Sequence, residues 1–304
     1  MARSWITRSL AITLSAGLLG IGTVLVFQNS MSFKTLLSGL ISESGAIVER
    51  GIAYGPHQRH KLDIYRPESG EDSGPIAFFL YGGGWRGGDR ATYGFIGSAL
   101  AARGVTTVIP DYRVYPEVKF PSFVEDAARA YAWTSEQLAE NGGEQRPIVV
   151  IGHSAGAHIG ALLVLDRGYL NGRRPAVAEP AGFVGLAGPY AFDPTTWHST
   201  KEIFASAQGA DDARPVAFAR PDAPPALVMH GLDDSVVRLW NMQTLTKELE
   251  EAGADVRQIE LPDIGHIGVV LAVAWPFRWR APVLSETLEF IGRVSDQAAA
   301  QGVR

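Results

Sequence analysis

The sequence of 304 residues contains no cysteine. Disulfide bonds, thiol nucleophiles and thiolate metal sites are therefore excluded, but the compartment stays open because oxidising compartments also hold cysteine-free proteins. Runs of lysine or arginine are absent as well, and the net charge is -5 with a pI near 5.8. This charge balance gives no electrostatic reason to expect a nucleic acid as a partner.

Only one apolar run is long enough to cross a bilayer, and it lies at the N-terminus. Arg3 and Arg8 precede residues 10–27, which are mostly apolar and carry no charge. The length suits a membrane-spanning helix, and the basic flank predicts that the N-terminus stays inside. We expect an uncleaved anchor, which would place the rest of the chain outside the cytoplasm. The alternatives are a cleaved export signal, although no convincing cleavage site follows, a buried hairpin, and a soluble protein whose true start is Met31.

The rest of the chain, residues 34–304, is expected to form one catalytic domain after the anchor or signal segment 1–33. Strand patterns alternate with helical patterns along it. The expected strands cover residues 47–54, 60–65, 76–81, 105–110, 147–151, 183–187, 226–230 and 256–261. The expected helices cover residues 93–103, 122–140, 155–163, 238–252 and 284–294. This alternation predicts an α/β fold with a mostly parallel central sheet and helices on both faces.

A G-x-S-x-G motif over residues 152–156 follows the apolar run that ends at Ile151. A strand, this motif and a helix together make a sharp turn that holds the serine hydroxyl clear of the sheet. Ser154 is therefore the leading candidate nucleophile. A chance match is the alternative in a chain with 34 glycines, but the strand, turn and helix around the motif favour the functional interpretation.

A serine nucleophile needs a histidine to take its proton, and that histidine needs an acid to orient it. His266 follows the last expected strand and reaches the sheet edge that carries Ser154, so we predict it as the base. The other histidines near expected elements suit surface or packing roles better: His57, His60, His153 and His158.

The acid should follow the strand 226–230, where Asp233 and Asp234 are adjacent. Only one of the two carboxylates can face His266. We predict Asp234 as the acid and expect Asp233 to accept hydrogen bonds from loop amides, as turn aspartates do. Asp263 is a third candidate, disfavoured because it is so close to His266 in sequence.

The glycine run that begins at Gly82 follows the expected strand 76–81. Backbone N–H groups can stabilise an oxyanion only where no side chain blocks their approach. We therefore predict an oxyanion hole formed by the amides of Gly83, Gly84 and Ala155. A phosphate-binding loop is the alternative, but the run has neither the G-K-[ST] ending nor the G-x-G-x-x-G spacing. Trp85 either lines the substrate pocket or fills the core.

These motifs together resemble the α/β-hydrolase superfamily, in particular the carboxylesterase branch related to hormone-sensitive lipase, kynurenine formamidase and isoprenylcysteine methylesterase. The resemblance covers roughly residues 47–294. It rests on residues 81–85, 111–113, 152–156, 230–237 and 265–266, with the order Ser154, Asp234, His266 that is typical of this superfamily. The family begins its oxyanion loop with histidine, whereas this chain has Tyr81. The resemblance implies that no metal or organic cofactor is needed.

The residues predict a serine hydrolase that cleaves small carboxylic esters through an acyl-enzyme. A formamidase or other amidohydrolase would use the same residues with a different leaving group, so the substrate is a small-molecule ester or amide. A non-catalytic hydrolase-fold binding protein is the remaining alternative. Such a protein would be expected to have lost one member of the triad, and all three can be named here.

Overall fold

The computed structural model describes residues 39, 41–68, 73–141, 144–171 and 177–302. The expected anchor or signal segment, residues 1–33, lies outside the described residues. Among the helices of the described part, none is both long enough and apolar enough to cross a membrane.

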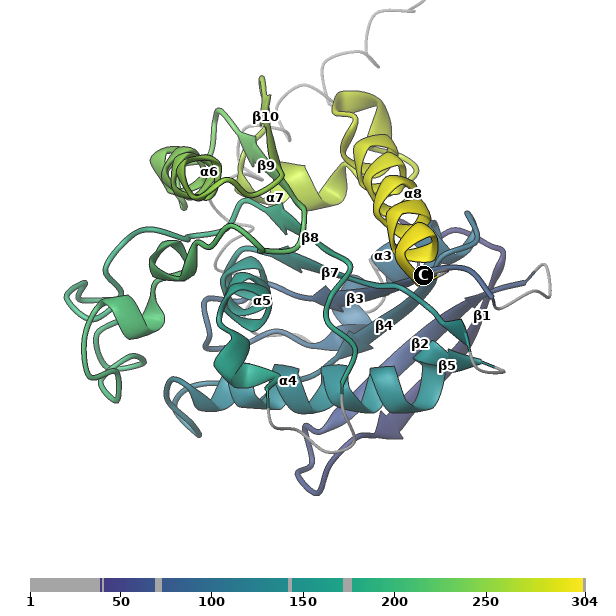
Figure 1. Ribbon diagram of the computed structural model, residues 1–304, viewed down its shortest axis with the longest axis horizontal. Coiled ribbons are helices and arrows are strands. Elements are labelled where there is room, and N and C mark those ends of the chain that lie inside the picture. Colours follow the sequence, from purple (N-terminus) through teal and green to yellow (C-terminus); the bar gives the residue numbers. More distant parts are fainter. Residues whose placement is uncertain (1–38, 40, 69–72, 142–143, 172–176, 303–304) are drawn as a thin grey trace, which may run out of the picture.

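The centre of the fold is an eight-stranded sheet with the strand order β1-β2-β4-β3-β7-β8-β9-β10 (Figure 1). The strands are β1 (Ala46–Ala53), β2 (Lys61–Pro67), β3 (Ile76–Leu80), β4 (Thr106–Pro110), β7 (Ile148–His153), β8 (Gly182–Leu186), β9 (Ala226–Gly231) and β10 (Val256–Leu261). Strand β2 is antiparallel to β1 and to β4, and all other neighbouring strands are parallel. The predicted α/β fold with a mostly parallel sheet is confirmed.

The central strands are continuous apolar runs because helices cover both of their faces. Every residue of β3, β4, β7, β8 and β9 is buried. Strand β10 at the edge has a mixed pattern of buried and exposed residues instead. Parallel strands that are buried on both faces are expected to be continuous apolar runs. The positions of these strands could therefore be predicted well from the sequence.

Helices α3 (Gly94–Ala101) and α8 (Val283–Gly302) cover one face of the sheet, and α4 (Ser122–Thr134) and α5 (Ala155–Leu165) cover the other (Figure 1). Helix α6 (Trp240–Ala252) packs beside β9 and β10 and ends at Gly253, which has a φ of 88°. A left-handed residue at this place favours glycine, so the predicted helix end is confirmed.

Three local predictions differ from the structure. Helix α7 (His266–Leu271) occupies a segment expected to be a loop, because six residues are too few to show helical periodicity. Helix α4 ends at Thr134 and continues as one π-helical turn over Ser135–Ala139, followed by a small hairpin of β5 (Glu140–Asn141) and β6 (Glu144–Gln145). Helix α8 extends well beyond the expected end at residue 294.

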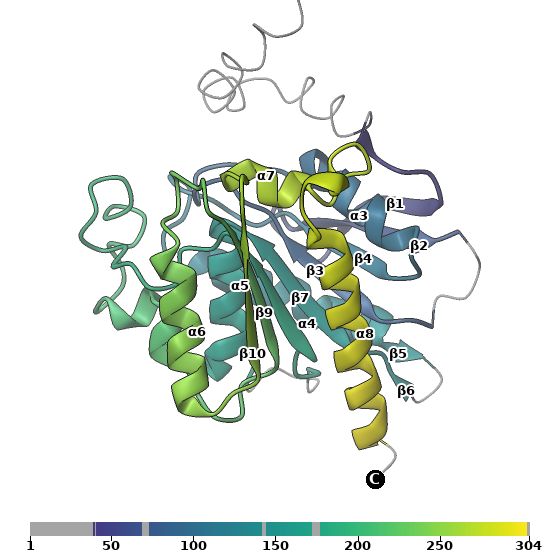
Figure 2. The same cartoon turned by 90° about the horizontal axis from the view of Figure 1, so that it is seen from above.

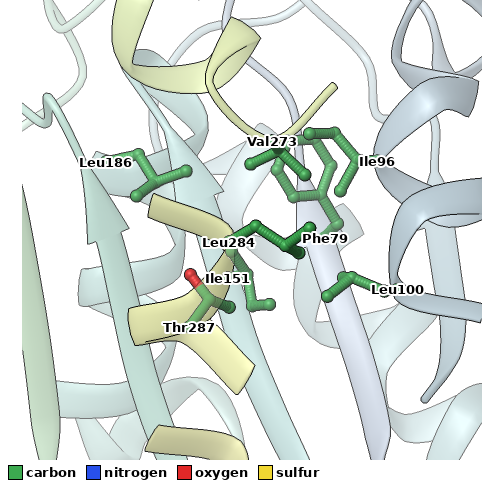
Figure 3. Close-up of a pocket in the computed structure, with 8 residues that line it drawn as sticks. All are labelled: Phe79, Ile96, Leu100, Ile151, Leu186, Val273, Leu284 and Thr287. Carbon is green, nitrogen blue, oxygen red and sulfur yellow. The ribbon is translucent and has the colours of Figure 1, made fainter. Parts of the chain in front are cut away.

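An apolar pocket lies between the sheet and the helices α3 and α8 (Figure 3). Its one polar side chain belongs to Thr287, whose hydroxyl donates to the Val283 carbonyl oxygen at 2.7 Å. None of the predicted catalytic residues lines it. The lining residues are Phe79, Ile96, Leu100, Ile151, Leu186, Val273, Leu284 and Thr287. We interpret this pocket as a gap in core packing, because no polar group in it is free to fix a ligand.

Candidate active site

Ser154 occupies a sharp turn between β7 and α5. Its φ of 55° and ψ of -123° are rare for a residue with a side chain, and the surrounding backbone holds it there. Its N–H donates to the Leu186 carbonyl oxygen at 2.9 Å, while its own carbonyl oxygen accepts from the N–H groups of Ala157 and His158 at 3.0 and 3.1 Å. The turn therefore fixes the serine side chain in a partly exposed position above the sheet.

The glycines on either side of Ser154 are required by close backbone contacts. A Cβ atom at Gly152 would lie 2.5 Å from the Gly156 carbonyl oxygen. A Cβ atom at Gly156 would lie 2.1 Å from the Leu80 carbonyl oxygen at the end of β3. The strand, the turn and the helix can approach this closely only when both positions lack a side chain.

The structure brings together Ser154 from the turn after β7, Asp234 from the loop after β9 and His266 from the start of α7. The Ser154 Oγ lies 2.8 Å from His266 Nε2, and His266 Nδ1 lies 2.7 Å from Asp234 Oδ2. The carboxylate can only accept, so Nδ1 carries the proton and Nε2 accepts from the serine hydroxyl. The side chain of His266 is 9% exposed and that of Asp234 is 0% exposed. This is the arrangement in which an imidazole can take the serine proton.

Asp234 is held as a carboxylate by several donors. Its Oδ1 accepts from the N–H groups of Val236 and Val237 at 2.8 and 2.9 Å, and its Oδ2 accepts from His266. Burial alone would raise the pKa of this carboxyl, but the hydrogen bonds from His266 and the two amides outweigh burial and lower it. The loop amides expected to bind Asp233 therefore bind Asp234, and the Asp233 side chain is exposed.

The glycine loop after β3 lies directly against the nucleophile. A Cβ atom at Gly82 would lie 2.9 Å from the Ser154 Cβ atom. Gly83 and Gly84 are exposed, and, among the described residues, their N–H groups and that of Ala155 donate to no backbone acceptor. Ala155 is the first residue of α5, where a helix always leaves N–H groups free. These three amides are therefore not engaged by other backbone groups, and the oxyanion hole stays a prediction.

Tyr81 occupies the position where the family has histidine, and it is buried. Its hydrogen bonds link the start of the glycine loop to neighbouring parts of the domain. Its hydroxyl donates to Asp111 Oδ1 at 3.0 Å and accepts from Arg59 Nη2 at 2.9 Å. The same guanidinium donates to the Gly88 carbonyl oxygen at 2.9 Å. Tyr112 stacks on the Tyr81 ring with centroids 4.7 Å apart. Burial raises the pKa of Tyr81 well above its usual value, so its hydroxyl stays protonated and can donate.

Trp85 is buried beneath the glycine loop. Its ring packs at 5.2 Å from the His158 ring and at 5.1 Å from the Phe204 ring, and it stacks against Phe192 at 6.3 Å. Its indole nitrogen is buried and has no hydrogen-bond partner among the described residues. Its role in substrate binding stays a prediction.

His153, which the sequence suggested for packing, contacts the predicted base. Its Nε2 donates to the carbonyl oxygen of His266 at 3.2 Å, and the two rings lie 5.0 Å apart. Burial, together with the nearby His266, lowers the pKa of His153 to about 3. A neutral imidazole therefore supports the backbone of the base without adding a charge beside it. No sequence signal distinguishes this role, since the contact joins residues 113 positions apart.

Within the described ranges, no group of three or more histidine, aspartate or glutamate side chains is placed so that it could hold a metal ion.

Two family models match the chain. The BD-FAE model matches residues 62–179, and the model of the prolyl oligopeptidase family matches residues 124–274. Among curated proteins, isoprenylcysteine alpha-carbonyl methylesterase ICME from Arabidopsis thaliana is 27% identical over 271 residues, covering 82% of this chain and 61% of the relative. Esterase LipC from Mycobacterium tuberculosis is 28% identical over 251 residues, covering 75% of this chain and 62% of the relative. The chain thus spans somewhat less than two thirds of these relatives.

Solved esterase structures have the same fold. An inhibited esterase B from Lactobacillus rhamnosis matches with a TM-score of 0.77 at 17% identity, covering 93% of this chain and 99% of that one. Propionate-bound Est2 from Thermogutta terrifontis matches with a TM-score of 0.65 at 21% identity, covering 82% of this chain and 93% of that one. The resemblance inferred from the motifs is confirmed: the chain is similar to esterases of the α/β-hydrolase superfamily over most of its length and has the same fold as solved esterases.

Proposed function

We propose that the protein is a serine carboxylesterase that hydrolyses small carboxylic esters through an acyl-enzyme. The hydrogen-bonded series Ser154, His266 and Asp234, with contacts of 2.8 and 2.7 Å, is the observation that carries the proposal. Relatives named as esterases and as isoprenylcysteine methylesterases support it.

The proposed reaction has two halves. Ser154 Oγ attacks the ester carbonyl carbon while His266 Nε2 takes the hydroxyl proton, and the amides of Gly83, Gly84 and Ala155 stabilise the oxyanion. When the C–O bond to the alcohol breaks, His266 gives that proton to the leaving alkoxide. A water molecule then attacks the acyl-enzyme as His266 takes its proton. The acid is released, and Ser154 Oγ regains a proton from His266.

Amide hydrolysis in the same site is the second candidate. The match to the prolyl oligopeptidase family runs over residues 124–274 and includes all three proposed catalytic residues. An amide would require His266 to protonate a more basic leaving group, with no change in the residues used. Esters remain the first choice because the named relatives are esterases.

The test of the function is a panel of small esters, formamides and peptides with three proteins: the wild type, Ser154→Ala and Ser285→Ala. Ser285 is exposed in α8 and provides the matched control. We expect ester turnover in the wild type and in the control variant, and none from Ser154→Ala above the solution rate. Hydrolysis of formamides alone would show that the protein is a formamidase and not an esterase. Undiminished turnover by Ser154→Ala would contradict a mechanism with Ser154 as the nucleophile.

We also propose that residues 1–33 hold the protein on a membrane with the catalytic domain outside the cytoplasm, as the apolar residues 10–27 behind two arginines suggest. Cells that express the full chain should carry it in the membrane fraction, and protease added outside the cytoplasmic membrane should digest it. Recovery of the whole full-length protein in the cytosol would contradict this proposal, and a shortened N-terminus by mass spectrometry would identify a cleaved export signal instead.

A further inference from the structure

Exposed apolar side chains gather on the segment that leads away from the catalytic histidine. His266 opens α7, and the next residue, Ile267, is 44% exposed. Beyond α7, Trp275 is 57% exposed and Trp279 is 80% exposed. The Trp279 indole N–H turns back to the Pro276 carbonyl oxygen at 3.2 Å, so this side chain is held in place by its own loop. We call Ile267, Trp275, Trp279 and Arg280 the tryptophan surface.

The tryptophan surface is fixed to the part of the domain where the described chain begins. Arg278, one residue before Trp279, forms an ion pair with Glu43, and Glu43 also lies 3.2 Å from Arg103 Nη1. Figure 2 shows α7 and the loop after it at the same end of the molecule as the start of β1 (Ala46–Ala53). The tryptophan surface and the entry point of the N-terminal segment are therefore neighbours.

Chain length limits how far this surface can lie from a bilayer that holds the N-terminal segment. The apolar run ends at residue 27, and Ile41 already belongs to the packed core. The 13 residues between them, 28–40, make 14 Cα-to-Cα steps that can span at most about 50 Å when fully extended. A tether of this length keeps the domain at the membrane, and the side of the domain nearest to the tether carries the tryptophans.

We propose that the tryptophan surface rests in the headgroup region of a phospholipid bilayer, so that the active site receives esters whose apolar chain is dissolved in that bilayer. This deepens the proposed esterase function and rests on it for the identity of the substrate. Tryptophan is enriched at this depth because its ring is apolar while its N–H still finds a polar partner.

The composition of the surface fits lipid better than it fits another protein segment. Arg280 follows Trp279 and is exposed, and its Nη2 donates to the Asp263 carbonyl oxygen at 3.0 Å, whereas the Arg278 guanidinium is paired with Glu43. A guanidinium has five N–H donors, so those that remain on Arg280 can bind lipid phosphates while the Trp279 indole enters the apolar layer. An apolar helix of the same chain would instead be expected to cover aliphatic side chains without a cation among them.

The experiment uses the full chain reconstituted into phosphatidylcholine and phosphatidylglycerol vesicles with brominated acyl chains, which quench nearby indoles. Replacing Trp275 and Trp279 with Phe should remove most of the quenchable fluorescence. Trp197→Phe is the matched control, because Trp197 is also 57% exposed but lies in the insert between β8 and β9. Trp5 contributes the same background to every variant.

A second pair of variants tests the delivery of substrate. Trp275→Ser with Trp279→Ser should reduce hydrolysis of a long-chain ester embedded in vesicles about tenfold or more, since each 1.4 kcal/mol of lost docking is a factor of ten. Hydrolysis of a water-soluble short-chain ester should stay within about twofold, because neither indole belongs to the proposed triad or oxyanion hole. Trp197→Ser should change neither rate.

The outcomes separate the surface from the esterase function. Absence of quenching from Trp275 and Trp279 by the brominated chains overturns the proposal; if both indoles in these vesicles are then also protected from acrylamide, a protein segment or a second copy covers them. An equal loss of vesicle hydrolysis in Trp197→Ser overturns it too. If the wild type hydrolyses no soluble ester while its indoles are quenched by lipid, the esterase function fails and the docking stands.

Discussion

Two of the buried aspartate–histidine pairs among the described residues have similar distances and different surroundings. His266 Nδ1 lies 2.7 Å from Asp234, and its Nε2 faces the Ser154 hydroxyl. His60 Nε2 lies 3.0 Å from Asp126, and its Nδ1 accepts the N–H of His57 at 3.3 Å. The Nε2 atom of His266 therefore contacts the candidate nucleophile, Ser154. Both ring nitrogens of His60 contact groups with no proposed catalytic role.

The two carboxylates differ in the same way. Asp126 accepts from the Arg113 backbone N–H at 3.0 Å and from its guanidinium at 2.7 and 2.8 Å. Burial raises the pKa of Asp126, but these bonds outweigh burial and lower it. Arg113 thus neutralises Asp126, whereas the positive charge that Asp234 would stabilise is the imidazolium of His266 that forms in the proposed reaction. A close aspartate–histidine contact is not by itself a sign of catalysis; the group at the other imidazole nitrogen decides.

The largest difference is expected when the two histidines are replaced. His266→Gln should reduce kcat for ester hydrolysis about 10⁴-fold or more, because Ser154 loses its base. His60→Gln should leave kcat within about twofold in the protein that remains folded. Steady-state kinetics normalised to folded protein by circular dichroism measures both. Comparable losses of kcat in His266→Gln and His60→Gln would contradict the different roles assigned to the two histidines.

The two aspartates should separate activity from stability. Asp234→Asn should reduce kcat about 10³- to 10⁴-fold, since the imidazole loses the carboxylate that orients it. Asp126→Asn should lower the free energy of unfolding by about 2 to 3 kcal/mol, because the Arg113 guanidinium loses its charged partner. Urea denaturation and kinetics on both variants check this. An Asp126→Asn enzyme that unfolds normally but has lost its activity would contradict the structural role.

His60 should contribute to the pH dependence of the free energy of unfolding. Burial lowers the pKa of His60, although Asp126 opposes the shift. Below about pH 6.5 the unfolded chain therefore takes up a proton that the folded protein refuses, so stability falls as the pH falls. His60→Gln should remove up to about 2 kcal/mol of that loss between pH 6.5 and pH 5. Urea denaturation at both pH values measures it, and an unchanged pH slope would show that His60 is protonated in the folded state.

The smallest effect is expected at Asp233, which adjoins the acid of the triad. Its side chain is exposed, and the loop amides bind Asp234 instead. Asp233→Asn should therefore change kcat by less than about twofold, as surface substitutions usually do. A larger loss than that of Asp234→Asn would move the triad by one residue.

Much of this could be read from the sequence because the signals are local. The buried strands are continuous apolar runs, and the elbow combines a strand, two glycines and a helix in one short stretch, so the fold and the position of Ser154 follow directly. Asp234 and His266 follow from the rule that loops after parallel strands meet at one sheet edge.

The remaining features depend either on contacts between distant parts of the chain or on local geometry that leaves no periodic signal. Tyr81 meets Arg59 and Asp111 through bonds that span 22 and 30 positions, and no local pattern marks such partners. The choice between Asp233 and Asp234 as acceptor of the loop amides depends on the turn geometry of a few residues. Helix α7 was missed because its six residues are too short for a periodic signal.

Trapping the acyl-enzyme tests the central claim most directly. The full-length protein is mixed with a short-chain activated ester, quenched in acid within milliseconds and digested for mass spectrometry. The account predicts one acyl group per chain on the peptide that contains Ser154, formed before steady-state turnover and absent from Ser154→Ala. Acyl transfer to another residue, or turnover by the wild type in single-turnover conditions with no acyl group at Ser154, would contradict it.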